Sequence, residues 1–268
     1  MRQMIDVIPF LPDLRRYART LTGSQHLGDA LVSLTLEDAE YCEAEEGLDK
    51  QRLYRLLSRI WTGPVGDYWR STEQVRKRQP EQLQRQLIRL TPRARQAYLL
   101  VAMERFSPSA AAHILEMPEA ELHAALKLAQ RQIAAQRAVN VLIIEDEPLI
   151  AVDLESIVTD LGHNVVGISR TRASAVAKAK SVKPNLILSD IKLADDSSGI
   201  EAVEEILQSR DVPAIFITAF PERLLTGLRR EPAFLITKPF RADMVRAVIG
   251  QALFWSQDVP PIEASTDA

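Results

Sequence analysis

The sequence predicts an all-helical N-terminal region followed by an α/β domain built on a doubly wound parallel sheet. In residues 10–137, apolar side chains recur at three- and four-residue spacing, which is typical of amphipathic helices. From residue 139 on, helical patterns alternate with short runs of branched aliphatic side chains, each followed by a polar residue, at 141–144, 186–188, 214–217 and 234–236. Continuous apolar runs of this length are typical of parallel strands covered on both faces.

The chain is long enough for two domains and ordinary in composition. It has 268 residues, of which 46% are hydrophobic and 26% are charged. Residues 1–138 carry 20 Lys and Arg against 17 Asp and Glu, a net charge of +3, whereas residues 139–268 carry 13 against 19, a net charge of −6. Neither balance is extreme enough to indicate nucleic-acid binding by itself.

Cysteine content and hydropathy indicate the cellular compartment. The single cysteine, Cys42, excludes an internal disulfide and fits a reducing cytoplasm. The N-terminus lacks the basic-then-apolar order of a signal peptide, and no apolar stretch approaches the roughly 18 residues that a membrane span needs. We therefore expect a cytoplasmic protein without a membrane segment.

Residues 1–63 are predicted to form a first group of helices, and residues 64–80 a linker. Gly63-Pro64 and Pro80 bracket this polar, basic linker. Between Arg19 and Lys50 the chain has no Lys or Arg but eight Asp and Glu residues. This acidic stretch is either a solvated helix face or an interaction surface, and under both interpretations it repels the phosphates of DNA.

Residues 81–138 are predicted to form a second, compact group of helices. Thr91-Pro92 and Ser107-Pro108 are helix starts, with the hydroxyl residue as N-cap and proline at the first helical position. Pro118 opens a last helix, whose inward-facing residues are Leu122, Leu126, Ala129 and Ile133. A short helix joined tightly to a longer one resembles a helix-turn-helix, and the order resembles the promoter-reading end of extracytoplasmic-function sigma factors.

The charges on that last helix do not fit a DNA reader. A recognition helix offers Arg, Lys, Asn or Gln to bases and phosphates, mostly from its N-terminal half. Here that half, residues 118–126, contains two glutamates and no basic residue. The sequence therefore predicts the fold of a DNA-binding domain without its surface, and we expect no direct DNA binding.

Residues 139–255 are predicted to form the α/β domain. The expected strands span 140–145, 164–169, 185–190, 213–218 and 233–237, and the expected helices span 148–161, 172–181, 199–208, 221–229 and 241–253. Five such βα units match a doubly wound sheet of strand order 2-1-3-4-5. The remaining residues, 256–268, are rich in proline and small polar side chains and are expected to be disordered.

Polar side chains follow four of the predicted strands, where parallel sheets place their functional sites. They are Glu145-Asp146, Asp190, Thr218-Ala219 and Lys238-Pro239-Phe240. Three carboxylates with a hydroxyl and an ammonium form a site for a hard cation and a phosphoryl group. In this order and spacing the four motifs resemble the receiver domains of response regulators.

The resemblance to receivers implies a role for each residue. Asp190 is expected to attack a phosphoryl group delivered by a phosphohistidine donor, and Thr218 and Lys238 to bind the resulting phosphate. Mg²⁺ is the expected cofactor, with ligands implied at Glu145, Asp146, Asp190 and the backbone carbonyl of Lys192. We expect no enzyme activity beyond this self-phosphorylation.

One departure from the receiver pattern concerns signalling. Many receivers carry an aromatic residue three positions before the lysine, but here that position is Leu235. Residues 216–223 instead resemble a receiver subclass with an aromatic residue two positions after the threonine. We assign the packing switch to this residue, Phe220, although it is equally compatible with a plain core position.

A sigma-like region followed by a C-terminal receiver is an uncommon order. Over residues 5–254 it resembles the PhyR-type response regulators of the alphaproteobacterial general stress response. The resemblance implies a phosphorylation-activated mimic of a sigma factor, which captures a small anti-sigma factor of the NepR type and so frees an extracytoplasmic-function sigma factor. We expect the protein to be a monomer. It also implies a sensor histidine kinase or phosphotransfer protein as a partner. Two alternatives remain, a receiver-controlled DNA-binding transcription factor and a phosphate sink with an inert helical region.

Overall fold

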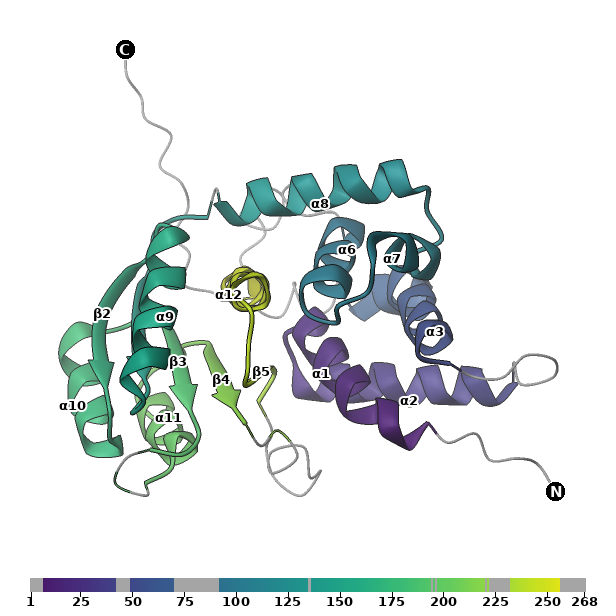
Figure 1. Cartoon of the computed structure of the whole chain (residues 1–268). Helices are drawn as coiled ribbons and strands as arrows, with labels where there is room; N and C mark the ends of the chain where they lie inside the picture. The colour runs from purple at the N-terminus through teal and green to yellow at the C-terminus, as the bar shows by residue number, and fades with distance from the viewer. Residues whose placement is uncertain are drawn as a thin grey trace, which may run out of the picture.

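The computed structural model contains a helical half and an α/β half that lie side by side (Figure 1). It describes residues 7–41, 49–69, 92–134, 136–193, 195, 197–219, 221 and 232–255. The predicted tail at 256–268, the switch residue Phe220 and most of the predicted helix at 221–229 lie outside these described residues. No helix in the described part of the chain is long and apolar enough to cross a membrane.

The first group of helices begins with a short 3-10 helix, η1 (Ile8–Phe10), and continues with three α-helices, α1 (Leu11–Thr22), α2 (Gln25–Tyr41) and α3 (Lys50–Thr62). Helix α1 ends at Gly23, whose φ of 68° is left-handed and therefore suits glycine. Helix α3 begins after Asp49, whose carboxylate accepts a hydrogen bond from the backbone N–H of Arg52 at 2.7 Å. Residues 64–69, at the start of the predicted linker, are helical.

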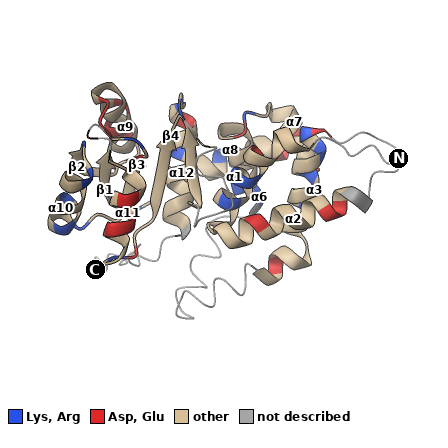
Figure 2. Ribbon diagram, turned by 90° about the horizontal axis from the view of Figure 1, so that it is seen from below, with Lys and Arg blue, Asp and Glu red and all other residues tan. Residues whose placement is uncertain are grey.

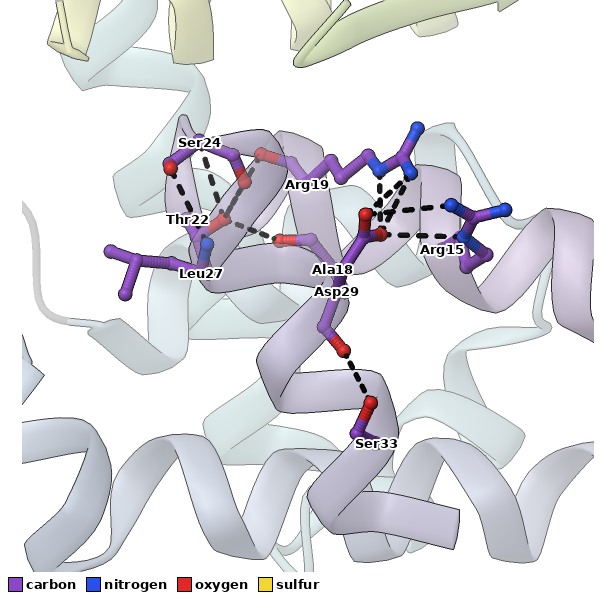
Figure 3. Close-up of polar contacts among 8 residues, drawn as sticks. All are labelled: Arg15, Ala18, Arg19, Thr22, Ser24, Leu27, Asp29 and Ser33. Atoms are coloured by element: carbon purple, nitrogen blue, oxygen red, sulfur yellow. Dashed lines mark hydrogen bonds and ion pairs between the residues drawn. The ribbon is translucent and has the colours of Figure 1, made fainter. Parts of the chain in front are cut away.

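Helices α1 and α2 are joined by a partly buried ion pair (Figure 3). The guanidinium of Arg19 is fully buried and donates two hydrogen bonds of 2.8 Å to the carboxylate of Asp29, which also pairs with Arg15 at 3.3 Å. The two helices approach closely beside this pair. A Cβ atom added to Gly28 would lie only 2.7 Å from the Cα of Arg19, so this position requires glycine. The pair therefore fixes how α2 lies against α1.

The second group contains α6 (Pro92–Ala102), α7 (Pro108–Ile114) and α8 (Glu119–Ala134). The predicted N-cap is confirmed at Ser107, whose hydroxyl accepts a hydrogen bond from the backbone N–H of Ala110 at 3.1 Å. Leu122 and Ala129 of α8 are buried, as the spacing predicted. Leu126 and Ile133 are only half-buried, because α8 packs on its neighbours along one side and is exposed on the other.

The α/β half has the predicted architecture. Its five strands are all parallel, in the order β2-β1-β3-β4-β5: β1 (Asn140–Ile144), β2 (Asn164–Ser169), β3 (Leu186–Asp190), β4 (Ala214–Thr218) and β5 (Phe234–Thr237). The described helices between and after them are α9 (Pro148–Asp160), α10 (Arg172–Val182), α11 (Gly199–Leu207) and α12 (Ala242–Trp255). Successive side chains of β1 enter different cores: Val141 and Ile143 face the side of α9 and α12, whereas Leu142 and Ile144 face α10 and α11.

Helix α12 lies between the sheet and the helical half (Figure 1), and the core on its side of the sheet continues into the helical half. The amide of Gln251 donates a hydrogen bond to the carbonyl of Leu21 in α1 at 3.1 Å. The guanidinium of Arg95 in α6 lies 3.6 Å from the ring centroid of Phe254. Strand β5 also packs on α1. The two halves are therefore docked through β5 and α12.

Candidate phosphoacceptor site

The structure places four of the predicted site residues, Glu145, Asp190, Thr218 and Lys238, at the carboxyl edge of the sheet. The parallel register pairs Asp190 at the end of β3 with Ile217 of β4, and Thr218 at the end of β4 with Thr237 of β5. Glu145 directly follows β1 and Lys238 directly follows β5. Sheet register alone therefore sets these side chains around one point.

The ammonium of Lys238 is the centre of this arrangement. Its Nζ lies 2.6 Å from Oδ2 of Asp190, 3.0 Å from Oε2 of Glu145 and 3.3 Å from Oε1 of Glu147. The side chains of Glu145 and Asp190 are 0% and 10% exposed, but that of Glu147 is 61% exposed. One cation thus holds two buried carboxylates and one at the surface.

The pKa values of Glu145 and Lys238 are both raised, but for different reasons. Burial raises the pKa of Glu145 to about 7, and the charge of Asp190 adds to this, although the Lys238 ammonium opposes it. For Lys238, burial lowers the pKa, but the hydrogen bonds and negative charges of Asp190 and Glu145 outweigh it, so the net pKa is raised. Lys238 therefore remains an ammonium, which is the form that binds a phosphate.

The loop after β3 holds Asp190 in place. Its Oδ1 accepts hydrogen bonds from the backbone N–H groups of Ile191 at 2.5 Å and Lys192 at 3.4 Å, which leaves Oδ2 facing Lys238. The N–H of Gly199 donates to the carbonyl of Ile191 at 2.8 Å. A Cβ on Gly199 would lie 1.7 Å from the carbonyl oxygen of Asp190, so this close approach requires glycine.

Strand β5 connects the site with the helical half. The backbone N–H of Lys238 donates to the carbonyl of Thr218 at 2.7 Å. One residue earlier, the hydroxyl of Thr237 accepts a hydrogen bond of 3.4 Å from Arg16 of α1. Arg16 also pairs at 3.1 Å with Glu104, a fully buried carboxylate in the turn after α6, which accepts the hydroxyl of Tyr54 in α3 at 2.6 Å.

The donor set of the site fits a hard cation. Glu145, Glu147 and Asp190 each offer a carboxylate oxygen within 4.8 Å of the others. Oε2 of Glu145 is buried and accepts no hydrogen bond from any described residue, although it lies at ion-pair distance from Lys238. Oxygen ligands of this kind are those that Mg²⁺ prefers. Asp146, a predicted ligand, is half-buried and is not one of these three residues, and Lys192 forms a β-bridge with Ser198.

One contact at the site was not predicted. Glu147 contacts Lys238, but in the sequence it cannot be distinguished from the many other glutamates expected on helix surfaces. Its position could have indicated a special role, because Glu147 is the N-cap of α9 and precedes Pro148. Ser, Thr, Asp and Asn are the usual side chains at an N-cap, so a glutamate there is unexpected.

The surface of α8 keeps the charge pattern that the sequence indicated. Glu119 and Glu121 in its first turn are exposed, and Lys127 and Arg131 appear only in its later turns. Figure 2 shows further acidic residues along α2, and the exposed residues of this helix include Glu37 and Asp38. These surfaces offer few cations where a recognition helix and its neighbours would meet DNA phosphates.

Three family models match the chain in order. Residues 7–58 match the Sigma2 domain of PhyR, residues 87–136 the sigma-like domain of response regulator PhyR, and residues 141–250 the response regulator receiver domain. The matched ranges follow the two groups of helices and the α/β half described above.

Relatives match over nearly the whole chain. The phyllosphere-induced regulator PhyR of Methylorubrum extorquens is 48% identical over 263 residues, which are 96% of this chain and 97% of that protein. The crystal structure of PhyR from Brucella abortus is similar with a TM-score of 0.77 at 47% identity, covering 93% of both chains. The anti-anti-sigma factor PhyR from Bartonella quintana has a TM-score of 0.78 at 47% identity, covering 92% of this chain and 94% of that one. The Bartonella quintana protein has also been crystallised in complex with the anti-sigma factor NepR.

Proposed function

The chain belongs to the PhyR family of response regulators, with sigma-like regions before a receiver domain, and on this premise we propose that phosphorylation of Asp190 controls capture of an anti-sigma factor by the helical half. The docking described above is the unphosphorylated, self-inhibited arrangement. The phosphorylated protein captures the anti-sigma factor and frees a sigma factor.

The proposed chemistry uses the residues around Lys238. A carboxylate oxygen of Asp190 attacks the phosphorus of a phosphohistidine, the P–N bond breaks, and the donor's imidazole leaves with the electron pair. Lys238 and the hydroxyl of Thr218 then bind the oxygens of the new acyl phosphate. We propose Asp146, Asp190 and the carbonyl of Lys192 as ligands of Mg²⁺, with Glu145 acting through a water. When bound, the metal offsets the negative charge of the carboxylates and the incoming phosphoryl group.

One observation carries the proposal: β5 belongs both to the phosphoacceptor site and to the contact with the helical half. Lys238 pairs with Asp190 at 2.6 Å, and the adjacent Thr237 accepts the hydrogen bond of Arg16. When the lysine moves toward a phosphate, the end of β5 moves with it. Phosphorylation therefore acts directly on the docking contact.

The free-energy difference that phosphorylation must supply depends on how complete the switch is. A ligand shifts an equilibrium only by the difference in its affinity for the two arrangements. Moving the protein from 1% to 99% undocked needs about 5.5 kcal/mol of such difference. A smaller difference gives a partial switch, in which the protein is either partly undocked without phosphate or partly docked with it.

We propose a small anti-sigma factor of the NepR type as the partner, and a sensor histidine kinase or phosphotransfer protein as the donor. Family membership and the described anti-anti-sigma role of the Bartonella quintana relative support the partner. The acidic first turn of α8 supports mimicry rather than promoter reading, because such a surface repels DNA.

A binding titration tests the proposal. The affinity of the purified protein for its anti-sigma factor is measured with and without acetyl phosphate and Mg²⁺, in the wild type and in Asp190→Asn. We expect tighter binding on phosphorylation in the wild type alone. Equal affinity in the two conditions contradicts the gating, and tight, salt-dependent binding of duplex DNA contradicts the mimicry.

A further inference from the structure

Glu147 contacts the central lysine of the site, and neither receiver chemistry nor the proposed function above assigns it a role. It occupies the N-cap of α9, but its side chain makes no capping hydrogen bond. Its Oε1 lies 3.3 Å from Nζ of Lys238 instead. Glutamate is poorly suited to capping, and Glu147 does not cap α9. Its side chain is held instead by its contact with Lys238.

The three carboxylates around Lys238 differ in how firmly they are held. Asp190 is fixed by two backbone N–H groups. Glu145 is fully buried, and its Oε1 accepts the backbone N–H of Glu147 at 3.2 Å. Glu147 makes the longest contact with the ammonium and is 61% exposed. Of these three, Glu147 is thus the partner that water replaces most easily.

An ammonium has three donors, and here each faces one carboxylate. A phosphoryl group on Asp190 brings further anionic oxygens that need the same donors. Glu147 therefore competes with the phosphoryl oxygens for Lys238. Its negative charge also repels the incoming anion, and solvent weakens this repulsion because the side chain of Glu147 is 61% exposed.

We propose that Glu147 is a positioning residue, which holds Lys238 in the unphosphorylated site and thereby opposes phosphorylation of Asp190. It acts through the lysine and not on the phosphorus. This inference rests on the proposed function, because it assumes that Asp190 takes the phosphoryl group. It predicts that removing the charge of Glu147 favours the phosphorylated state over the unphosphorylated one.

The competing role for Glu147 is that of a metal ligand, because its oxygen also lies within 4.8 Å of those of Glu145 and Asp190. The two roles predict opposite signs. Loss of a metal ligand weakens binding of Mg²⁺ and of the phosphoryl group that the metal supports. Loss of a competitor for Lys238 strengthens binding of the phosphoryl group and leaves Mg²⁺ binding nearly unchanged.

Beryllofluoride, a stable mimic of a phosphoryl group on a carboxylate, makes this an equilibrium measurement. Its affinity is measured by ¹⁹F NMR at saturating Mg²⁺ for the wild type and for Glu147→Gln. We expect roughly 1.5- to fivefold tighter binding by the variant, the range for loss of one largely exposed ionic competitor. The ε-methylene ¹³C resonance of Lys238 should also shift in the beryllofluoride-free variant.

Two further variants serve as controls. Glu155→Gln removes the same charge from an exposed position of the same helix and should leave the affinity for beryllofluoride at the wild-type value. Glu147→Asp keeps the charge but favours capping of α9, which withdraws the carboxylate from Lys238, so it should behave like Glu147→Gln. A wild-type affinity for Glu147→Asp means that charge alone matters and overturns the positioning role.

The outcomes separate this inference from the proposed function. If the wild type binds beryllofluoride and Asp190→Asn does not, the phosphoacceptor assignment holds. Unchanged or weaker beryllofluoride binding by Glu147→Gln then overturns the role of Glu147 alone. If the wild type itself binds no beryllofluoride, the assignment of Asp190 fails first.

Discussion

Phe254→Ala is expected to weaken the docking of the two halves without changing the phosphoacceptor site. The ring lies 3.6 Å from the guanidinium of Arg95, so the substitution removes a cation–π contact between α12 and α6. Such contacts are worth about 0.5–2 kcal/mol, depending on how well they are shielded from water. If docking blocks the anti-sigma surface, the undocked fraction of the unphosphorylated protein rises by about 2- to 30-fold.

The assay is a fluorescence anisotropy titration of a labelled anti-sigma factor. Apparent affinity is the intrinsic affinity multiplied by the undocked fraction, so it should rise by the same factor without phosphate. In the phosphorylated protein, which is already undocked, it should stay the same. Leu149→Ala is the matched control, because Leu149 is an apolar residue on α9 that is 83% exposed. An affinity that rises equally in both states, or in neither, refutes the reasoning.

Three other substitutions test the helical half, the loop after β3 and the buried carboxyl group. Asp29→Asn weakens the pair with buried Arg19, so urea denaturation should show a free energy of unfolding lower by roughly 2–3 kcal/mol; a loss within error would contradict this. Gly199→Ala forces a Cβ against the carbonyl of Asp190, so the rate of labelling by acetyl phosphate should fall by an order of magnitude or more, and wild-type labelling would show that the loop adapts. The pKa of Glu145 is raised from 4.5 to about 7, so between these values the folded protein holds a proton that the unfolded chain has lost. In Mg²⁺-free buffer the free energy of unfolding should therefore decrease as the pH rises through this window, and Glu145→Gln should flatten the dependence.

The α/β half could be predicted closely from the sequence, because both faces of its strands are covered. The predicted helix at 148–161 corresponds to Pro148–Asp160, and the predicted strand at 185–190 to Leu186–Asp190. A continuous apolar run between helices has few other structural meanings. The same reasoning placed Glu145, Asp190, Thr218 and Lys238 at one edge, because in a parallel sheet the order of strands determines which residues meet.

Side-chain contacts between residues far apart in the sequence could not be predicted in this way. Arg16 and Thr237 are 221 positions apart, and neither lies in a motif that indicates a partner. Glu104 has the sequence context of a residue in an exposed turn, yet it is fully buried against Arg16 and Tyr54. Such contacts depend on how separate groups of helices and the sheet pack together, and local periodicity carries no information about that packing.

Strand β5 is well placed to transmit a small displacement. Among the described strands it is an edge strand, four residues long and paired with β4, so few ladder hydrogen bonds oppose its movement. At its end, Thr237 accepts a hydrogen bond of 3.4 Å from Arg16, which is long enough that a slight shift breaks it.

When that hydrogen bond breaks, the charge of Arg16 is still paired, because its ion pair with Glu104 remains within the helical half. Loss of the contact with β5 therefore requires little free energy, whereas breaking the pair with Glu104 would require much more. Undocking at β5 is thus favoured over disruption of the helical half. A phosphate that draws Lys238 inward can release the sigma-like region as an intact, folded unit.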